Sequence, residues 1–160
     1  LENGRYYLDS DGVVQTGWLE LEDSRYYLGS TGVMQTGWLE LDGQRYSLGQ
    51  DGRMVVGWQE IGENRYYFRE DGSTLQGWTV SGRDQVYFLE RGKLAVGWHT
   101  IGERRYYFRE NGTVATGLVS TPEGTFLILE DGSLYTGWLE QDGCRQYFFE
   151  NGVIRSFMLS

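Results

Sequence analysis

Tryptophan and tyrosine recur at fixed spacing along this chain, and their rings are the groups best suited to hold a ligand. Each Trp follows a Gly, and an Arg-Tyr-Tyr or related stretch begins seven residues later, as in Trp58 and Arg65-Tyr66-Tyr67. Aromatic faces attract cations and stack on other flat groups. The candidate ligand-binding residues are those that follow the Gly or end the Tyr-Tyr stretch: Trp18, Tyr27, Trp38, Trp58, Tyr67, Trp78, Tyr87, Trp98, Tyr107, Trp138 and Tyr147.

An arginine precedes the tyrosines in most copies, and a Glu lies five residues before it. Where the Glu is lost, at Val80 and Ser120, the arginine is lost too, and only Thr100 with Arg105 breaks this rule. Residues five apart across a tight turn face each other on adjacent strands, which predicts ion pairs. A guanidinium also stacks on aromatic rings, so a ligand-binding role stays open. The predicted pairs are Glu20–Arg25, Glu40–Arg45, Glu60–Arg65 and Glu140–Arg145, and the arginines that are structural, ligand-binding or both are Arg25, Arg45, Arg65, Arg105 and Arg145.

Catalysis requires a unique constellation of side chains, and this sequence offers none. His99 occupies a position held by Leu or Gln in other copies, and Cys144 one held by Ser, Gln or Asn. The acids recur at turn positions, which accounts for them without chemistry. The stretch 9–12 resembles a calcium loop, but the other copies do not repeat it. We therefore expect a protein that is not an enzyme and that uses neither a cofactor nor a metal.

Charge and hydropathy exclude two further classes of partner. The net charge is −9, whereas nucleic-acid binding needs a basic face. No apolar run approaches the 18 or so residues of a membrane-spanning helix, so we expect no membrane insertion.

The chain is an internal repeat with a period of 20 residues. Asp-Gly or a related pair recurs at this interval from Gly12 to Gly152, with no insertion. The copy at about 118–137 deviates, because Leu118 replaces the Trp and 125–127 replaces Arg-Tyr-Tyr. We interpret residues 1–160 as a single repeat array, and expect it to be a fragment of a longer protein.

The turn signals and apolar pattern predict a β-hairpin for each copy. A three-residue turn with Gly12 in the left-handed region pairs Leu8 with Val14, and this register places an apolar residue opposite an apolar residue in seven of eight copies. Alternation then puts Tyr6 and Trp18 on the Leu8 face, with Tyr6 and its equivalents in the core. The prediction is an all-β fold, a superhelical β-solenoid of about eight tandem hairpins.

The motif Gly-Trp, Tyr-Tyr-Phe, Asp-Gly, Gly-Trp resembles the cell-wall-binding repeats. These occur in choline-binding surface proteins and autolysins of Gram-positive bacteria and in glucan-binding glucosyltransferases. The copies at 57–77 and 97–117 are also similar to the receptor-binding repeats of large clostridial toxins. The resemblance implies a left-handed superhelix with ligand sites in the grooves between consecutive repeats.

The arginine departs from this family, in which a Trp at that position completes an aromatic cage for choline. A guanidinium removes one ring and adds a repulsive charge, so we expect weak choline binding at best. The best groove is expected to involve Trp58 and Tyr67, and the poorest Leu118.

The resemblance implies a non-catalytic module that tethers a secreted protein to the bacterial cell wall or surface. Its partners would be a cell-wall polymer or glycan and the attached domain of the full-length protein. Two alternatives stay open: a structural spacer whose grooves are filled by its own side chains, and toxin-like recognition of host glycans.

Overall fold

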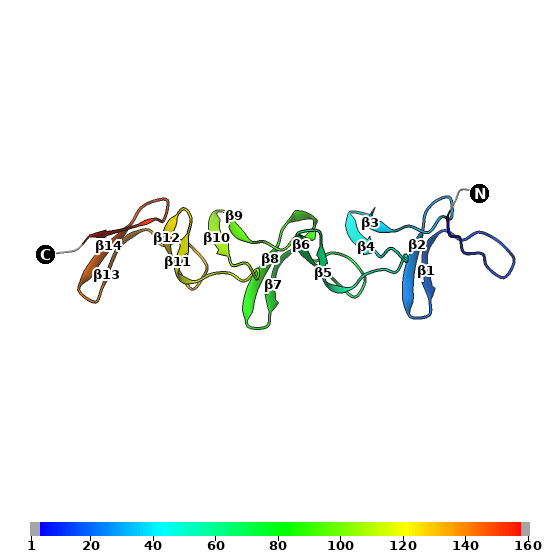
Figure 1. The fold of residues 1–160 in the computed structure, drawn as a ribbon, viewed down its shortest axis with the longest axis horizontal. Helices are drawn as coiled ribbons and strands as arrows, with labels where there is room; N and C mark the ends of the chain where they lie inside the picture. The colour runs from blue at the N-terminus through cyan, green and yellow to red at the C-terminus, as the bar shows by residue number, and fades with distance from the viewer. Residues whose placement is uncertain (1–3, 158–160) are drawn as a thin grey trace. The chain divides into compact units, whose positions relative to one another are not determined.

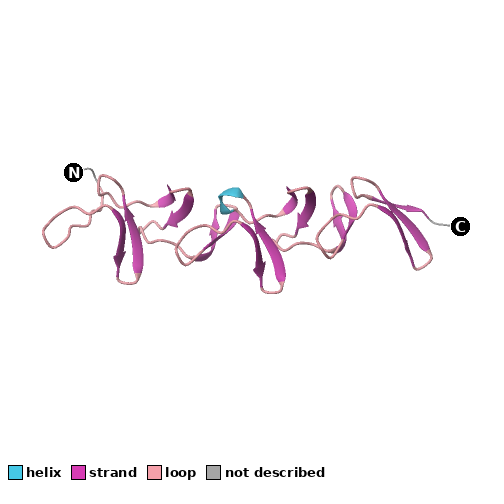
Figure 2. Cartoon of the chain, turned by 180° about the vertical axis from the view of Figure 1, so that it is seen from behind, coloured by secondary structure: helices cyan, strands magenta, loops and turns pink. Residues whose placement is uncertain are grey.

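Paired strands dominate the computed structural model of the chain, which describes residues 4–157. Seven hairpins follow one another, and β15 adds a third strand to the last of them. Figure 1 labels these strands, and Figure 2 shows the loops between them and one short 3₁₀ turn. The elements are β1 (Gly17–Leu21), β2 (Ser24–Leu28), β3 (Gly37–Leu41), β4 (Gln44–Leu48), β5 (Gly57–Ile61), β6 (Asn64–Phe68), β7 (Gly77–Ser81), β8 (Asp84–Phe88), η1 (Glu90–Gly92), β9 (Gly97–Ile101), β10 (Arg104–Phe108), β11 (Gly117–Thr121), β12 (Gly124–Ile128), β13 (Gly137–Gln141), β14 (Cys144–Phe148) and β15 (Ile154–Phe157).

The chain divides into two compact units. One contains the residues up to 77 together with 88–94, and the other contains 78–87 together with the residues from 95 onward. Each unit has the same repeating construction, so the all-β solenoid of tandem hairpins predicted from the sequence is confirmed.

The seven hairpins have their tight turn between the two five-residue strands. This turn lies about ten residues further along the chain than the Asp-Gly turn of the same copy. In the first hairpin Glu22 and Asp23 form this turn with φ of 47° and 62°, both in the left-handed region. Two consecutive left-handed residues match the twist of the flanking strands, which favours Asp and Gly at these positions. The continuous ladder therefore lies across this second turn.

The predicted pairing across the Asp-Gly turn is also present, as a single bridge. Leu8 pairs with Val14, and the equivalent residues pair in the other seven copies. The eight turn glycines, from Gly12 to Gly152, all have φ between 77° and 86°, as a left-handed closing residue requires. Both expectations from the sequence are confirmed.

Side chains in the loop reinforce this turn. The Asp71 carboxylate accepts hydrogen bonds from the backbone N–H of Ser73 (2.8 Å) and from its hydroxyl (2.6 Å). The Ser73 hydroxyl, and then its backbone N–H, lower the pKa of Asp71 below its ordinary value. Asp131 and Ser133 repeat the arrangement, and the pKa of Asp131 is lowered for the same reason.

The core is a column of residues that end the second strand of each hairpin. In the seven hairpins from β1–β2 to β13–β14 this side chain is at most 3% exposed, whereas the equivalent Leu8, which precedes β1, is 52% exposed. The buried members are Leu28, Leu48, Phe68, Phe88, Phe108, Ile128 and Phe148. This is the column that the sequence pattern predicted.

Successive repeats approach each other closely at the turn glycine. A Cβ at Gly92 would lie 2.6 Å from Cβ of Thr74, in the preceding copy. In other copies the residue equivalent to Thr74 also lies close to the turn glycine of the following copy. These residues are Val14, Met34, Met54, Val114 and Leu134. Glycine is needed here for its conformation and also because there is no room for a side chain.

The tryptophans do not lie on the Leu8 face, and this part of the sequence interpretation is wrong. Trp18 pairs with Tyr27, and Glu20 pairs with Arg25, so all four side chains share one face of the hairpin. The reason is Gly17, whose φ of 81° interrupts the extended chain between Val14 and Trp18. Strand alternation cannot be counted through such a residue.

Alanine substitutions at two glycines should separate conformation from contact. Gly92→Ala and Gly97→Ala both force alanine into the left-handed region, at a cost of about 1–2 kcal/mol each. Only Gly92 faces Thr74, because nothing lies within 4 Å of a Cβ at Gly97. Gly92→Ala should therefore lower the unfolding midpoint further, with an overpacking term of about 1–3 kcal/mol. If both variants lose the same unfolding free energy in thermal and urea unfolding, the close approach of Thr74 to Gly92 does not constrain the fold.

Candidate functional site

Aromatic pairs form on one face of five of the seven hairpins, directly across the two strands. The Trp18 and Tyr27 rings meet edge-on, with centroids 5.2 Å apart. The same pair recurs in four more hairpins, as Trp58–Tyr67, Trp78–Tyr87, Trp98–Tyr107 and Trp138–Tyr147, at 4.9–5.4 Å. Trp38 faces Ser47 instead. The structure thus brings every candidate tyrosine from the sequence against its tryptophan.

The next hairpin supplies a second ring to several of these tryptophans. Trp18 contacts Tyr46 at 5.1 Å, and Trp38 contacts Tyr66 at 5.0 Å. Trp78 contacts Tyr106 in the same way, and Trp98 contacts Phe126: these rings lie 28 residues after their tryptophan. Sequence reasoning assigned the tyrosines of this set to the core alone and missed this contact. The 28-residue spacing was available as a signal, but only once the repeat stacking was known.

Arginine occupies the remaining face of five tryptophans. The guanidinium carbon of Arg45 lies 3.7 Å from the centroid of the Trp38 ring. The other distances are 4.7 Å for Arg25–Trp18, 4.9 Å for Arg65–Trp58, 4.3 Å for Arg105–Trp98 and 5.5 Å for Arg145–Trp138. Each of these rings therefore already carries a cation from its own hairpin.

The four predicted ion pairs are confirmed, and they add to the stacking of four of these arginines. The Nε–carboxylate distances are 3.3, 3.5, 3.9 and 3.6 Å for Glu20–Arg25, Glu40–Arg45, Glu60–Arg65 and Glu140–Arg145. The glutamates are mostly exposed, so each pair contributes about 0–1 kcal/mol. Arg105 keeps the stacked position with Thr100 opposite it instead of a glutamate, so the ring contact does not depend on the acid.

Arg45 combines these contacts most closely. Its side chain is 17% exposed, and its Nε is buried with no hydrogen-bond partner among the described residues, although Glu40 is within ion-pair distance. Charge attraction and stacking on Trp38 therefore hold the guanidinium. A partly desolvated cation–π contact of this kind is worth about 1–2 kcal/mol, more than the exposed ion pair.

Trp78 is the exception among the six tryptophans. Its hairpin has Val80 and Gln85 in place of the glutamate and the arginine, so it lacks the guanidinium that stacks on the ring in the other five. Three rings surround it: Tyr87 at 5.0 Å, Tyr106 at 5.0 Å and Phe108 at 5.9 Å. The indole is 41% exposed. The result is a partly exposed indole with three neighbouring rings and no stacked arginine.

The deviant copy has no aromatic platform. Leu118 pairs with Leu127 across β11 and β12, and it is 63% exposed. Ser120 and Thr125 replace the ion pair with a hydroxyl–hydroxyl hydrogen bond of 3.1 Å. A neutral, ring-free face lacks the attraction that the other hairpins offer to flat or cationic groups.

The residues examined for catalysis are not brought together. His99 Nε2 lies 3.0 Å from the carbonyl oxygen of Val96, and Cys144 is an exposed free thiol. Within residues 4–157 no group of three metal-ligating side chains is found. In the same part of the chain, no helix has the length and apolar character needed to cross a membrane.

Comparison with protein families identifies the repeats. A family described as choline-binding repeat matches residues 55–96, and a family described as cell wall binding repeat matches 16–34 and 96–113. No curated protein matches the chain significantly.

Solved structures give the same assignment. The chain is similar to CbpJ from Streptococcus pneumoniae, with 29% identity and a TM-score of 0.82, over 95% of this chain and 56% of that one. Choline-binding protein F from the same organism, solved with a peptidoglycan analogue, is 27% identical with a TM-score of 0.78, over 94% and 55%. The choline-binding domain of CbpL shares the fold, at 23% identity and a TM-score of 0.63, over 97% and 84%.

The chain spans little more than half the length of the first two of these proteins. Its repeats at 16–34 and 55–113 match cell-wall-binding repeats of the choline-binding type, and its period, its Gly-Trp and Tyr-Tyr positions and its fold are similar to theirs throughout.

Proposed function

We propose that this array is a non-catalytic binding module that tethers a secreted protein to a polymer of the bacterial cell wall. Repeats of this family imply a secreted or cell-surface location. The similar choline-binding protein F was solved with a tetrasaccharide-pentapeptide, which makes a wall polymer a reasonable partner here. Several weak sites on one array gain strength by avidity, as attachment to a polymer requires.

One observation supports a proposal about the chemistry of the attachment: the array supplies its own cation to five of its six tryptophans. A quaternary ammonium needs the same ring face, and it would have to displace a guanidinium held by stacking and, at four sites, by a glutamate. The module should therefore bind walls chiefly through glycan contacts and not through choline.

Trp78 is the site at which a quaternary ammonium group fits best. Sequence alone favoured the groove of Trp58 and Tyr67, but Arg65 lies over the Trp58 ring. At Trp78 the corresponding residue is the neutral Gln85, and three rings remain beside the indole. We propose at most one weak choline site, made by Trp78, Tyr87 and Tyr106.

The same arginines also favour a second function, that of a spacer whose grooves are filled by its own side chains. A spacer needs stacking between repeats and no ligand. Trp38 fits this description, since Arg45 covers its ring and Tyr66 and Phe68 pack beside it. Binding to walls separates the two functions.

Retention on purified Gram-positive cell walls is the first test. The chain should sediment with the walls, and millimolar free choline should not release it, because the polymer contacts are not made at choline cages. A repeat array of the same family that keeps its aromatic cages serves as the control, and choline should elute it. Absence of retention at any salt concentration would support the spacer function.

A calorimetric titration with choline is the second test. The wild-type chain should bind choline in the millimolar range or more weakly, and Trp78→Ala or Gln85→Arg should remove the signal. Loss of one cation–π contact corresponds to about a 2- to 30-fold change in Kd.

Arg65→Gln tests the same idea in the opposite direction. It removes the arginine from Trp58, so that Trp58 has a glutamine beside it, as Trp78 has Gln85. This variant should add a second weak site. Tight choline binding that is abolished by Trp58→Ala while Arg65 is present would contradict the proposed occupancy of the rings by arginine.

A further inference from the structure

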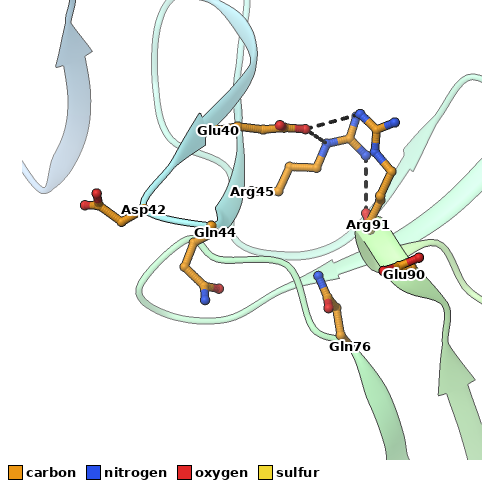
Figure 3. A pocket seen from close by; sticks show the side chains of 8 residues that line it. Glu40, Asp42, Gln44, Arg45, Gln76, Glu90 and Arg91 are labelled. Atoms are coloured by element: carbon orange, nitrogen blue, oxygen red, sulfur yellow. Dashed lines mark hydrogen bonds and ion pairs between the residues drawn. The ribbon is translucent and has the colours of Figure 1, made fainter.

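A polar pocket lies beside the turn of the β3–β4 hairpin. It has a volume of about 710 Å³, and it is open to solvent (Figure 3). Its walls come from three places in the chain: the hairpin itself, Gln76 just before β7, and the η1 turn. A volume of this size is within the range of small-molecule sites.

One wall of the pocket is a charged cluster that fastens the hairpin to η1. Glu40 lies 3.5 Å from Arg45 and 3.2 Å from Arg91, and Arg45 donates a hydrogen bond to the backbone oxygen of Arg91 at 3.2 Å. The dashed lines in Figure 3 mark these contacts. One carboxylate between two guanidinium groups leaves the cluster with an excess of one positive charge.

The backbone of Arg91 is unusual and helps to build this wall. Its φ is 70°, a conformation that costs a non-glycine residue about 1–2 kcal/mol. Among the described residues, the equivalent position in the other copies holds Asp, Asn or Thr without a positive φ. The strained turn directs the Arg91 side chain to Glu40.

The other walls present polar groups without internal partners. In the described part of the chain, the side chains of Asp42, Gln44, Gln76 and Glu90 make no hydrogen bond or ion pair, although all line the pocket. Figure 3 shows the Gln76 amide directed toward the charged cluster. Carboxylate acceptors, amide groups and guanidinium donors therefore surround one space.

The second unit contains the corresponding pocket, with different residues. It measures about 600 Å³, and its lining is displaced by 40 residues, with Thr116 at the place of Gln76 and Glu130 at the place of Glu90. There Arg109 donates to the Val114 carbonyl oxygen, and Asp131 is bound to Arg104. The fold thus forms this pocket in both units, and among the described residues both contain polar side chains without partners, but only the first contains the cluster of Glu40, Arg45 and Arg91.

We propose that the pocket beside the β3–β4 turn binds neutral, hydroxyl-rich sugar units of a glycan. Sugar hydroxyls donate to carboxylates and accept from amides and guanidinium groups, so they satisfy both kinds of unpartnered group at once. Three acids and two arginines nearly balance, which disfavours polyanions and simple cations alike. The inference rests on the proposed wall-binding function, and names a part of the polymer and the residues that contact it.

Chemical-shift mapping of the whole chain tests the proposal, with chito-oligosaccharide and isomalto-oligosaccharide as neutral probes and oligogalacturonate as the acidic one. At least one neutral probe should shift the amides around the β3–β4 turn and η1 in a saturable way. The double variant Gln76→Ala with Glu90→Ala should weaken its Kd about fivefold or more, as expected for the loss of two hydrogen bonds. Both residues are exposed, and the melting temperature checks that the fold is kept.

Thr116→Ala with Glu130→Ala, at the matching positions of the second pocket, should leave the Kd unchanged. No saturable binding of either neutral probe, equal effects of the two double variants, or a preference for the acidic probe would overturn the proposal. Wall retention measured on the same proteins keeps the two conclusions apart. Wall retention without sugar binding would contradict only the proposal about the pocket. Absence of wall retention in the wild-type chain would contradict the proposed wall-binding function.

Discussion

A hairpin with strands of five residues cannot bury a core by itself, and every other feature of this chain follows from that constraint. The side chains that end each second strand are buried where earlier repeats pack against them, as Trp38 packs against Phe68. Leu28 is 3% exposed, whereas Leu8, in the first copy, is 52% exposed. Backbone hydrogen bonds reinforce the stacking, since Met54 donates to the carbonyl oxygen of Arg25 at 2.7 Å. Stability is therefore shared between neighbours, as expected for a linear repeat protein.

The tryptophan face shows how stability and recognition compete for the same surface. A face of an exposed ring that is covered by a side chain of the protein is not available to a ligand. At Trp38 the protein side chain is Arg45, at 3.7 Å, and the two rings beside it come from the next hairpin. At Trp78 the neighbouring rings are retained and the cation is missing. The contrast arises from two substitutions on one hairpin, Val80 and Gln85, which leave the backbone pairing of the strands intact.

Much of this organisation could be predicted from the sequence because it depends on local spacing. The bridge from Leu8 to Val14 followed from the apolar pattern, and the Glu20–Arg25 pair from the joint loss of both residue types in other copies. The face occupied by Trp18 was predicted wrongly, since the left-handed Gly17 breaks the alternation on which the argument relied.

The stacking of arginine on tryptophan could have been inferred once Glu20 and Arg25 were paired, because Trp18 then lies on the same face. The pocket at the β3–β4 turn could not have been inferred from the sequence. Glu40 and Arg91 lie 51 residues apart, and no local pattern links them. Their contact depends on how far each repeat advances and rotates relative to the last, which is a property of the packed array.

The arginine over each ring has a consequence for how such an array can change. Because each guanidinium covers only the tryptophan of its own hairpin, the state of one cage is set by one residue, largely independently of the others. The number of open cages, and with it the avidity for a polymer that carries quaternary ammonium groups, can therefore rise or fall in single steps while the scaffold stays the same. Five of the six tryptophans now carry such an arginine, and Trp78 does not.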